Sequence, residues 1–194
     1  MSTCATTLRP MTRIALFVEI PGVLVAAWAP DVLLPDVGLA LRRLRERGVP
    51  VVAITDRPPV ETEDFAEFSQ SLQKKISELG GKLEAVYAAL PDRPASWRKP
   101  RPGMLLIAAK ELDINLPGSW LVGTNLNDAR AAAQAGCAGA VLVDFPDTHL
   151  EDLGIVVAIA RDLADAPRVM IPRQGGCWHD LRSGQSDEPT PSNH

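Results

Sequence analysis

Five short apolar runs recur between residues 14 and 143, and their residues are continuously apolar, apart from the final Thr55 of one run, instead of alternating with polar residues. The runs are Ile14–Val18, Val51–Thr55, Ala85–Ala88, Trp120–Val122 and Ala140–Val143. A continuous apolar pattern is typical of strands that are buried on both faces, as in a parallel sheet covered by helices on each side. The runs therefore predict a central parallel sheet.

Amphipathic segments lie between the apolar runs. Val37, Leu41 and Leu44 share one helical face, and Gly48 is a suitable stop for that helix. Three further helices are expected: one with an apolar stripe from Phe65 to Leu79 and Thr62 as its N-cap, one at Met104–Leu112 and one at Asn127–Ala135. Strands alternating with helices predict a three-layer, doubly wound, Rossmann-like α/β domain. The segment Gly154–Asp165 fits either a strand followed by a helix or a single helix.

The length of 194 residues fits one such domain, which we place at residues 12–166. Residues 1–11 form an N-terminal extension before the first apolar run. Residues 167–194 are polar and rich in Pro, Gly and Ser, so we expect a disordered C-terminal tail.

Composition excludes several classes of function. A formal net charge of −4 argues against broad nucleic-acid binding. No apolar run approaches the roughly 20 residues that cross a bilayer, and the first residues lack the apolar core of a secretory signal. The three cysteines, Cys4, Cys137 and Cys177, are too far apart to form a disulfide framework. We therefore expect a cytoplasmic protein with reduced thiols, no membrane association and no nucleic-acid partner.

In a doubly wound sheet, ligands bind at the carboxyl ends of the strands. Three strand-end segments carry polar residues there: Glu19–Gly22, Thr55–Arg57 and Gly123–Asp128. The segment "RKPRPG", Arg98–Gly103, adds a local cluster of positive charge. These segments are the candidate functional site.

At these loops the sequence resembles the haloacid dehalogenase-like (HAD) phosphatases, in particular the cap-poor group of heptose-bisphosphate and histidinol-phosphate phosphatases. Four stretches carry the resemblance: "ALFVEIPGVL", "VVAITD", "WRKPRPGMLLIAAKELDI" and "SWLVGTNLNDARAAAQAGCAGAVLV". They correspond to the family's four motifs in order. The resemblance implies a HAD-like domain with little or no cap. It also implies a chemistry in which an acid attacks phosphorus, a second acid serves the leaving group and water, and Mg²⁺ neutralises charge.

Three of the family's catalytic positions are changed in this sequence. Glu19 stands at the nucleophile position, where the family has Asp. Pro21 stands at the general acid/base position, and proline has neither a titratable group nor an N–H. Thr124 replaces an acid of the fourth motif that normally binds Mg²⁺, whereas Asp128 keeps the second acid. Asp128 follows a helix start, so it could equally be a helix cap.

The resemblance also implies a phosphate-binding set. Thr55 stands at the position of the family's phosphate-binding hydroxyl, and Asp56 follows it where this group usually has Asn. Arg98 and Lys99 match the basic residues of the third motif. Lys99 could instead pair with Glu19 or Asp128 and hold the loops together. Asp56 adds negative charge, which disfavours tight anion binding.

A zinc site is not expected. Relatives of this type usually carry Cys and His ligands before the third motif, but "VYAALPDRPASWRKP" contains neither residue. Cys177 and His179 have a metal-like spacing, but they lack a second pair of ligands.

Loss of a general acid/base alone typically lowers the rate by about 10²–10⁴-fold. We therefore expect a HAD-like protein that has lost phosphohydrolase activity, needs no cofactor, and acts by binding a phosphorylated small molecule or a protein partner. The alternative is an active Mg²⁺-dependent phosphomonoesterase that uses Glu19 on a sugar phosphate or a similar small phosphate ester.

Overall fold

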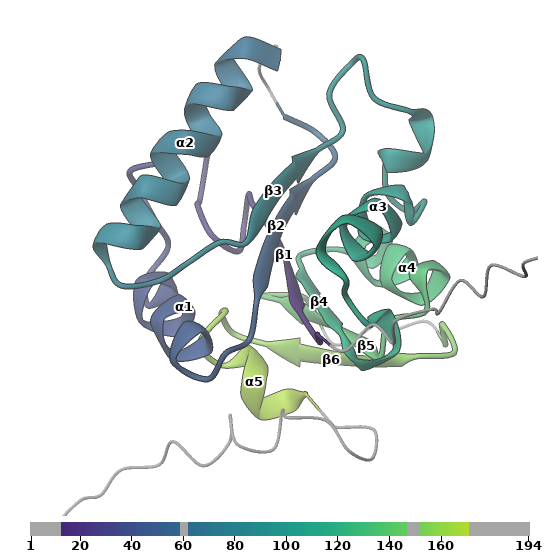
Figure 1. The fold of residues 1–194 in the computed structure, drawn as a ribbon. Helices are drawn as coiled ribbons and strands as arrows, with labels where there is room; N and C mark the ends of the chain where they lie inside the picture. The colour runs from purple at the N-terminus through teal and green to yellow at the C-terminus, as the bar shows by residue number, and fades with distance from the viewer. Residues whose placement is uncertain (1–12, 59–61, 147–151, 171–194) are drawn as a thin grey trace, which may run out of the picture.

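A computed structural model describes residues 13–58, 62–146 and 152–170 of the chain (Figure 1). The predicted N-terminal extension lies outside these residues, and so does the predicted tail from residue 171 onward, including Cys177 and His179.

A single six-stranded sheet forms the centre of the molecule, with the strand order β3-β2-β1-β4-β5-β6. Every neighbouring pair of strands is parallel, which confirms the predicted doubly wound α/β fold. The strands are β1 (Leu16–Glu19), β2 (Val51–Thr55), β3 (Ala85–Ala88), β4 (Trp120–Gly123), β5 (Gly139–Val143) and β6 (Val156–Ala160). The segment that was ambiguous in the sequence thus contains a strand, followed after a turn by a short helix.

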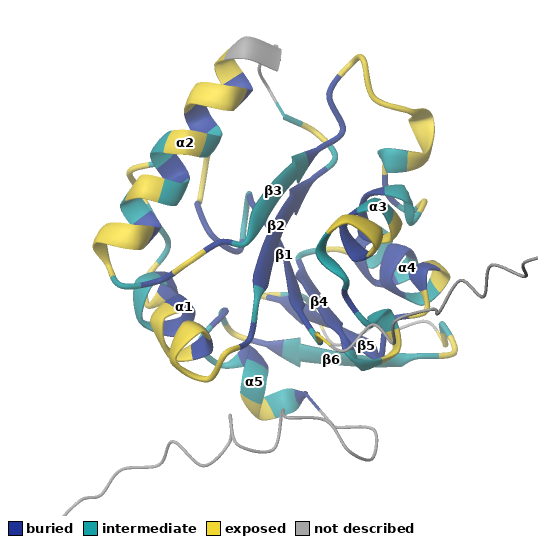
Figure 2. Ribbon diagram, viewed as in Figure 1, coloured by how far each residue is buried: buried dark blue, intermediate teal, exposed yellow. Residues whose placement is uncertain are grey.

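Helices cover both faces of the sheet, as Figure 1 shows. They are α1 (Val37–Glu46), α2 (Thr62–Glu78), α3 (Gly103–Leu112), α4 (Leu126–Ala135) and α5 (Ala166–Val169), with short 3₁₀ turns at Ala95–Trp97 and Leu116–Gly118. One apolar cluster joins α1, α2 and α5 to the sheet, and a second joins α3 and α4 to the opposite face. The four central strands, β1, β2, β4 and β5, are buried along their whole length (Figure 2).

The C-terminal end of the domain packs onto the first cluster. Ala166 and Met170 are fully buried there, so the packed chain runs a few residues past the predicted boundary at residue 166. No helix in the described ranges is long and apolar enough to span a bilayer.

Side-chain alternation along β1 determines where its last residue points. Leu16 and Val18 belong to the cluster under α1 and α2, whereas Phe17 belongs to the cluster under α3 and α4. Because successive side chains of a strand point to opposite faces, Glu19 turns toward the α3 and α4 side. Lys99 precedes α3 and Asp128 lies on α4, so both lie on the face to which Glu19 points.

Candidate functional site

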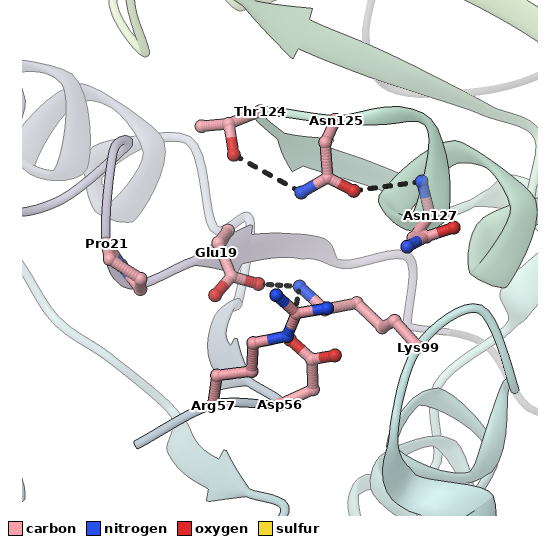
Figure 3. A pocket seen from close by; sticks show the side chains of 8 residues that line it. All are labelled: Glu19, Pro21, Asp56, Arg57, Lys99, Thr124, Asn125 and Asn127. Carbon is pink, nitrogen blue, oxygen red and sulfur yellow. Dashed lines mark hydrogen bonds and ion pairs between the residues drawn. The ribbon is translucent and has the colours of Figure 1, made fainter. Parts of the chain in front are cut away.

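A pocket of about 370 Å³ lies at the carboxyl ends of β1, β2 and β4. Its lining residues are drawn in Figure 3: Glu19, Pro21, Asp56, Arg57, Lys99, Thr124, Asn125 and Asn127. The pocket therefore forms where a doubly wound sheet is expected to bind a ligand.

Lys99 is the centre of the site. Its ammonium group donates to Glu19 Oε2 and to Asp128 Oδ1, and it lies 3.5 Å from Asp56 Oδ1. The side chains of Lys99, Glu19 and Asp128 are only 3%, 5% and 0% exposed. One buried ammonium group thus forms ion pairs with three carboxylates, which belong to the segments at the ends of β1, β2 and β4.

Asp128 combines the two roles that the sequence left open. Its Oδ2 accepts hydrogen bonds from the backbone N–H groups of Thr124, at 2.8 Å, and Asn125, at 3.1 Å. Asn125 caps α4 in return, because its side-chain oxygen accepts from the N–H of Asn127 at 2.9 Å. With Oδ1 on Lys99 and Oδ2 on the start of the helix, Asp128 is both a cap and part of the charged cluster.

Gly123 leaves the space that Asp128 occupies. A Cβ at this position would lie 2.4 Å from Asp128 Cγ and Oδ2. Real side chains do not tolerate such a separation, so any larger residue would displace the carboxylate. The glycine at the end of β4 therefore permits the cap and the contact with Lys99.

The loop after β1 provides no proton donor where the family has its acid/base. Pro21 lines the pocket, and its ring carries no ionisable group. The next residue, Gly22, has a φ of +82°, and a Cβ there would meet Thr124 Cγ2 at 2.7 Å. The turn is therefore held tightly against the loop after β4, with Pro21 fixed at the pocket wall.

Burial and charge act in opposite directions on the cluster. Burial raises the pKa of Glu19 to about 7, although Lys99 opposes the shift. Burial alone would lower the pKa of Lys99, but Glu19, Asp128 and Asp56 outweigh it and hold that pKa above its usual range. Asp128 differs from Glu19 in accepting hydrogen bonds from two backbone N–H groups as well as from Lys99.

The structure gathers most of the predicted site residues. Glu19, Pro21, Asp56, Lys99 and Thr124 line the pocket, and Asp128 lies buried behind Lys99.

Two predicted phosphate-binding residues do not line the pocket. Thr55 is fully buried at the end of β2, and within the described chain its hydroxyl has no hydrogen-bond partner. Arg98 is exposed, and its backbone N–H donates to Ala95 O at 3.2 Å within a local turn.

Three residues of the pocket were not singled out from the sequence. Arg57 lies two residues beyond β2 and brings a second cation to the pocket. Asn125 caps α4 and Asn127 lies in the first turn of that helix. A signal was available for all three, because each belongs to a strand-end segment that was expected to form the site.

The donor set does not fit a divalent cation. Glu19 Oε2 and Asp128 Oδ1 already accept hydrogen bonds from Lys99, and Asp128 Oδ2 accepts from two backbone N–H groups. Thr124 offers a neutral hydroxyl where Mg²⁺ prefers a carboxylate. Across residues 13–58, 62–146 and 152–170, no group of three or more His, Cys, Asp or Glu side chains is arranged to hold a metal ion.

Residues 6–136 match the sequence profile of the haloacid dehalogenase-like hydrolases. Two similar proteins are D-glycero-beta-D-manno-heptose-1,7-bisphosphate 7-phosphatases. The Bordetella bronchiseptica protein is 32% identical over 57% of this chain, and the Mesorhizobium japonicum protein is 33% identical over 60% of it. The matches cover 66% and 60% of those two proteins, so this chain spans about two thirds or less of their length.

Two solved structures share the fold. One is a D,D-heptose 1,7-bisphosphate phosphatase from B. bronchiseptica complexed with magnesium and phosphate, with a TM-score of 0.67 and 27% identity. It aligns over 79% of this chain and 96% of its own. The other is a HAD-like phosphatase from Mesorhizobium loti, with a TM-score of 0.66 and 27% identity, aligned over 88% of this chain and 84% of its own.

Proposed function

Because this chain belongs to the haloacid dehalogenase-like hydrolase family, we propose that it is a member that has lost phosphohydrolase turnover and acts by binding a small phosphate ester in the pocket. The observation that carries the proposal is Pro21, which lines the pocket where the resemblance places the general acid/base and has no ionisable group.

The chemistry of each step supports the loss of turnover. Glu19 offers an oxygen already engaged by Lys99, on a side chain one methylene longer than aspartate. A displacement of about 1 Å can lower a rate by roughly 10²-fold when in-line geometry matters. Pro21 cannot protonate a leaving alcohol, which lowers the rate by a further ~10²–10⁴-fold. Hydrolysis then lacks both its nucleophile geometry and its acid.

Binding makes smaller demands on the pocket than hydrolysis does. Its volume of about 370 Å³ is at the lower end of the range for small-molecule sites, which suits a compact sugar phosphate. Arg57, Asn125 and Asn127 bring hydrogen-bonding side chains to its wall. Similar proteins are named as phosphatases of a heptose bisphosphate, so sugar phosphates are the first ligands to test.

The charge of the pocket sets the expected affinity. With Glu19 ionised, three carboxylates offset Lys99 and Arg57, and a phosphate dianion is repelled. With Glu19 protonated, the charges balance. We therefore expect weak binding at pH 8 and tighter binding at pH 6, because burial raises the pKa of Glu19 to about 7.

The decisive experiment measures phosphate release with Mg²⁺ from heptose bisphosphate, histidinol phosphate and an aryl phosphate. We expect none above background from the wild-type chain. A matched variant, Glu19→Asp with Pro21→Asp and Thr124→Asp, restores the acids of the family motif and is expected to gain turnover. Wild-type turnover that disappears in Glu19→Ala would overturn the proposal and establish an active phosphomonoesterase.

Binding is measured separately by calorimetry with the same esters. We expect Arg57→Gln to weaken it and Arg47→Gln, an exposed arginine just after α1, to leave it unchanged. If the wild-type chain neither hydrolyses nor binds any ester, the function is to be sought in a protein partner.

A further inference from the structure

A second pocket, also of about 370 Å³, lies at the opposite edge of the sheet. Its charged wall consists of Arg13, Arg45, Lys82 and Glu84, and the turn Gly48–Val51 completes it. Because the strands are parallel, their amino ends all lie along one side of the sheet and their carboxyl ends along the opposite side; we call these sides the amino edge and the carboxyl edge. This pocket is therefore separate from the one around Lys99, and nothing proposed for that site depends on it.

Three segments that are distant in sequence bring the charges together. Arg13 precedes β1, Arg45 lies in the last turn of α1, and Lys82 and Glu84 precede β3. Figure 1 shows the end of α1 beside the start of β2, where the turn lies. Arg13 is held in place by its backbone, because its carbonyl accepts from Asn115 N at 2.8 Å.

Glu84 positions two of the cations. Its Oε1 accepts from Arg13 Nη2 at 3.0 Å, and its Oε2 lies 2.9 Å from Lys82 Nζ. Lys82 and Arg13 hold the pKa of Glu84 below its usual range, so the carboxylate stays ionised and keeps both partners. Arg45 is anchored from a different direction, because its Nη1 donates to Gly80 O at 3.2 Å.

Each cation keeps donors that can reach a ligand. A guanidinium carries five N–H donors and an ammonium carries three, whereas the contacts with Glu84 and Gly80 engage one donor of each side chain. Two carbonyl groups of the turn are already engaged and do not take up the donors of these cations: Pro50 O accepts from Leu16 N, and Val51 O accepts from Glu84 N. Arg13 and Lys82 are 45% and 62% exposed, so solvent and solutes reach them.

Three cations face one carboxylate in this pocket, in a chain whose formal net charge is −4. The overall negative charge opposes a long polyanion such as a nucleic acid, and the pocket has room only for a small molecule. Arginine forks and a lysine ammonium match phosphate and carboxylate groups through charge-assisted hydrogen bonds.

We propose that the pocket formed by Arg13, Arg45, Lys82 and Glu84 is a binding site for a small polyanion carrying at least two negative charges. Phosphate and carboxylate groups share the required chemistry. Pyrophosphate and citrate are the two probes that distinguish them.

The test is an NMR titration of the full chain, read from backbone amide signals. Pyrophosphate is expected to shift the signals of Gly48, Val49 and Lys82 saturably, with a Kd of about 1 mM or tighter. The signals of Thr124 and Asn127 report on the Lys99 pocket in the same spectra, so binding at either site is recognised independently of the other. Saturable shifts with citrate alone would assign the site to carboxylates.

Charge-matched variants separate a site from general screening. Arg45→Gln and Lys82→Gln are each expected to weaken binding about tenfold, because each removes charge-assisted hydrogen bonds. Lys110→Gln changes the net charge equally at an exposed position of α3 and is expected to change Kd less than about twofold. Shifts that stay linear for both probes, or an equal loss in Lys110→Gln, would overturn the proposal.

Discussion

At the carboxyl edge of the sheet one ammonium group lies among three carboxylates, whereas at the amino edge one carboxylate joins two cations and a third lies nearby. The two clusters differ above all in burial. The side chains of Lys99, Glu19 and Asp128 are at most 5% exposed, while those of Arg13 and Lys82 are 45% and 62% exposed.

This difference decides what each cluster contributes. Removing one member of a buried ion pair leaves an uncompensated charge without water, which is strongly destabilising. Removing one member of an exposed pair lets water and salt replace it at little cost. The cluster around Lys99 is therefore part of what holds three strand ends together, and the cluster around Glu84 is mainly available for binding.

The largest expected effect comes from Lys99→Met, which keeps the length of the side chain but removes its charge. Glu19, Asp56 and Asp128 would then face one another, and we expect a loss of about 3–5 kcal/mol in the free energy of unfolding. Lys82→Met is the matched change at the amino edge and is expected to cost less than about 1 kcal/mol. Urea unfolding measures both.

Divalent cations should stabilise Lys99→Met but not the wild-type chain. With Lys99 removed, the three carboxylates become available as oxygen ligands, so Mg²⁺ or Mn²⁺ should raise the melting temperature of Lys99→Met through linkage. The wild-type chain should show no such rise.

In the urea experiment, an equal loss of unfolding free energy in Lys99→Met and Lys82→Met would contradict the distinction between the two edges.

The pH dependence of the free energy of unfolding should differ between Glu19 at the carboxyl edge and Glu84 at the amino edge. The folded pKa of Glu19 is about 7, above its ordinary value of 4.5, so its contribution is fully present below pH 4.5 and is lost as the pH rises through 7. We expect wild-type stability to fall by up to about 3 kcal/mol over that range, and Glu19→Gln to flatten the profile. Chemical unfolding at several pH values measures this.

Glu84 should behave in the opposite way. Lys82 and Arg13 lower its pKa, so its contribution is present above the ordinary value and is lost as the pH falls through the lowered one. Glu84→Gln should therefore leave the slope between pH 5 and 8 unchanged, which makes it the control for Glu19→Gln. A flat wild-type profile would show that Glu19 remains ionised beside Lys99.

Much of the fold could be predicted because buried strands leave a continuous apolar pattern. Val51–Thr55 and Ala85–Ala88 were predicted with the bounds that the structure has. The last strand was ambiguous for a physical reason: β6 is an edge strand that pairs only with β5, and its residues are mostly half-buried. Its pattern therefore resembles that of an amphipathic helix as much as that of a strand.

The candidate site was predictable to the extent that strand ends converge. Glu19 ends β1, Asp56 follows β2, and Asp128 lies in the first turn of the helix after β4, so a parallel sheet brings all three to the carboxyl ends of its strands. Thr55 is fully buried at the end of β2, while the two residues after it, Asp56 and Arg57, line the pocket, so its phosphate-binding role stays a prediction. The amino-edge cluster was not predictable, since Arg13, Arg45 and Lys82 share no motif and meet only through the topology of the sheet.

The smallest expected effect is that of Glu84→Gln on stability at low salt. The variant loses both ion pairs at the amino edge, and we expect a cost of no more than about 1 kcal/mol because both cations are well exposed. Raising the ionic strength to about 1 M, where the Debye length is about 3 Å, should remove most of that cost. Glu19→Gln, measured at pH 8, should keep its salt-independent difference from wild type, because its carboxylate is buried. Urea unfolding at two salt concentrations measures both variants, and a salt-independent loss in Glu84→Gln would mean that the amino edge is as structural as the cluster around Lys99.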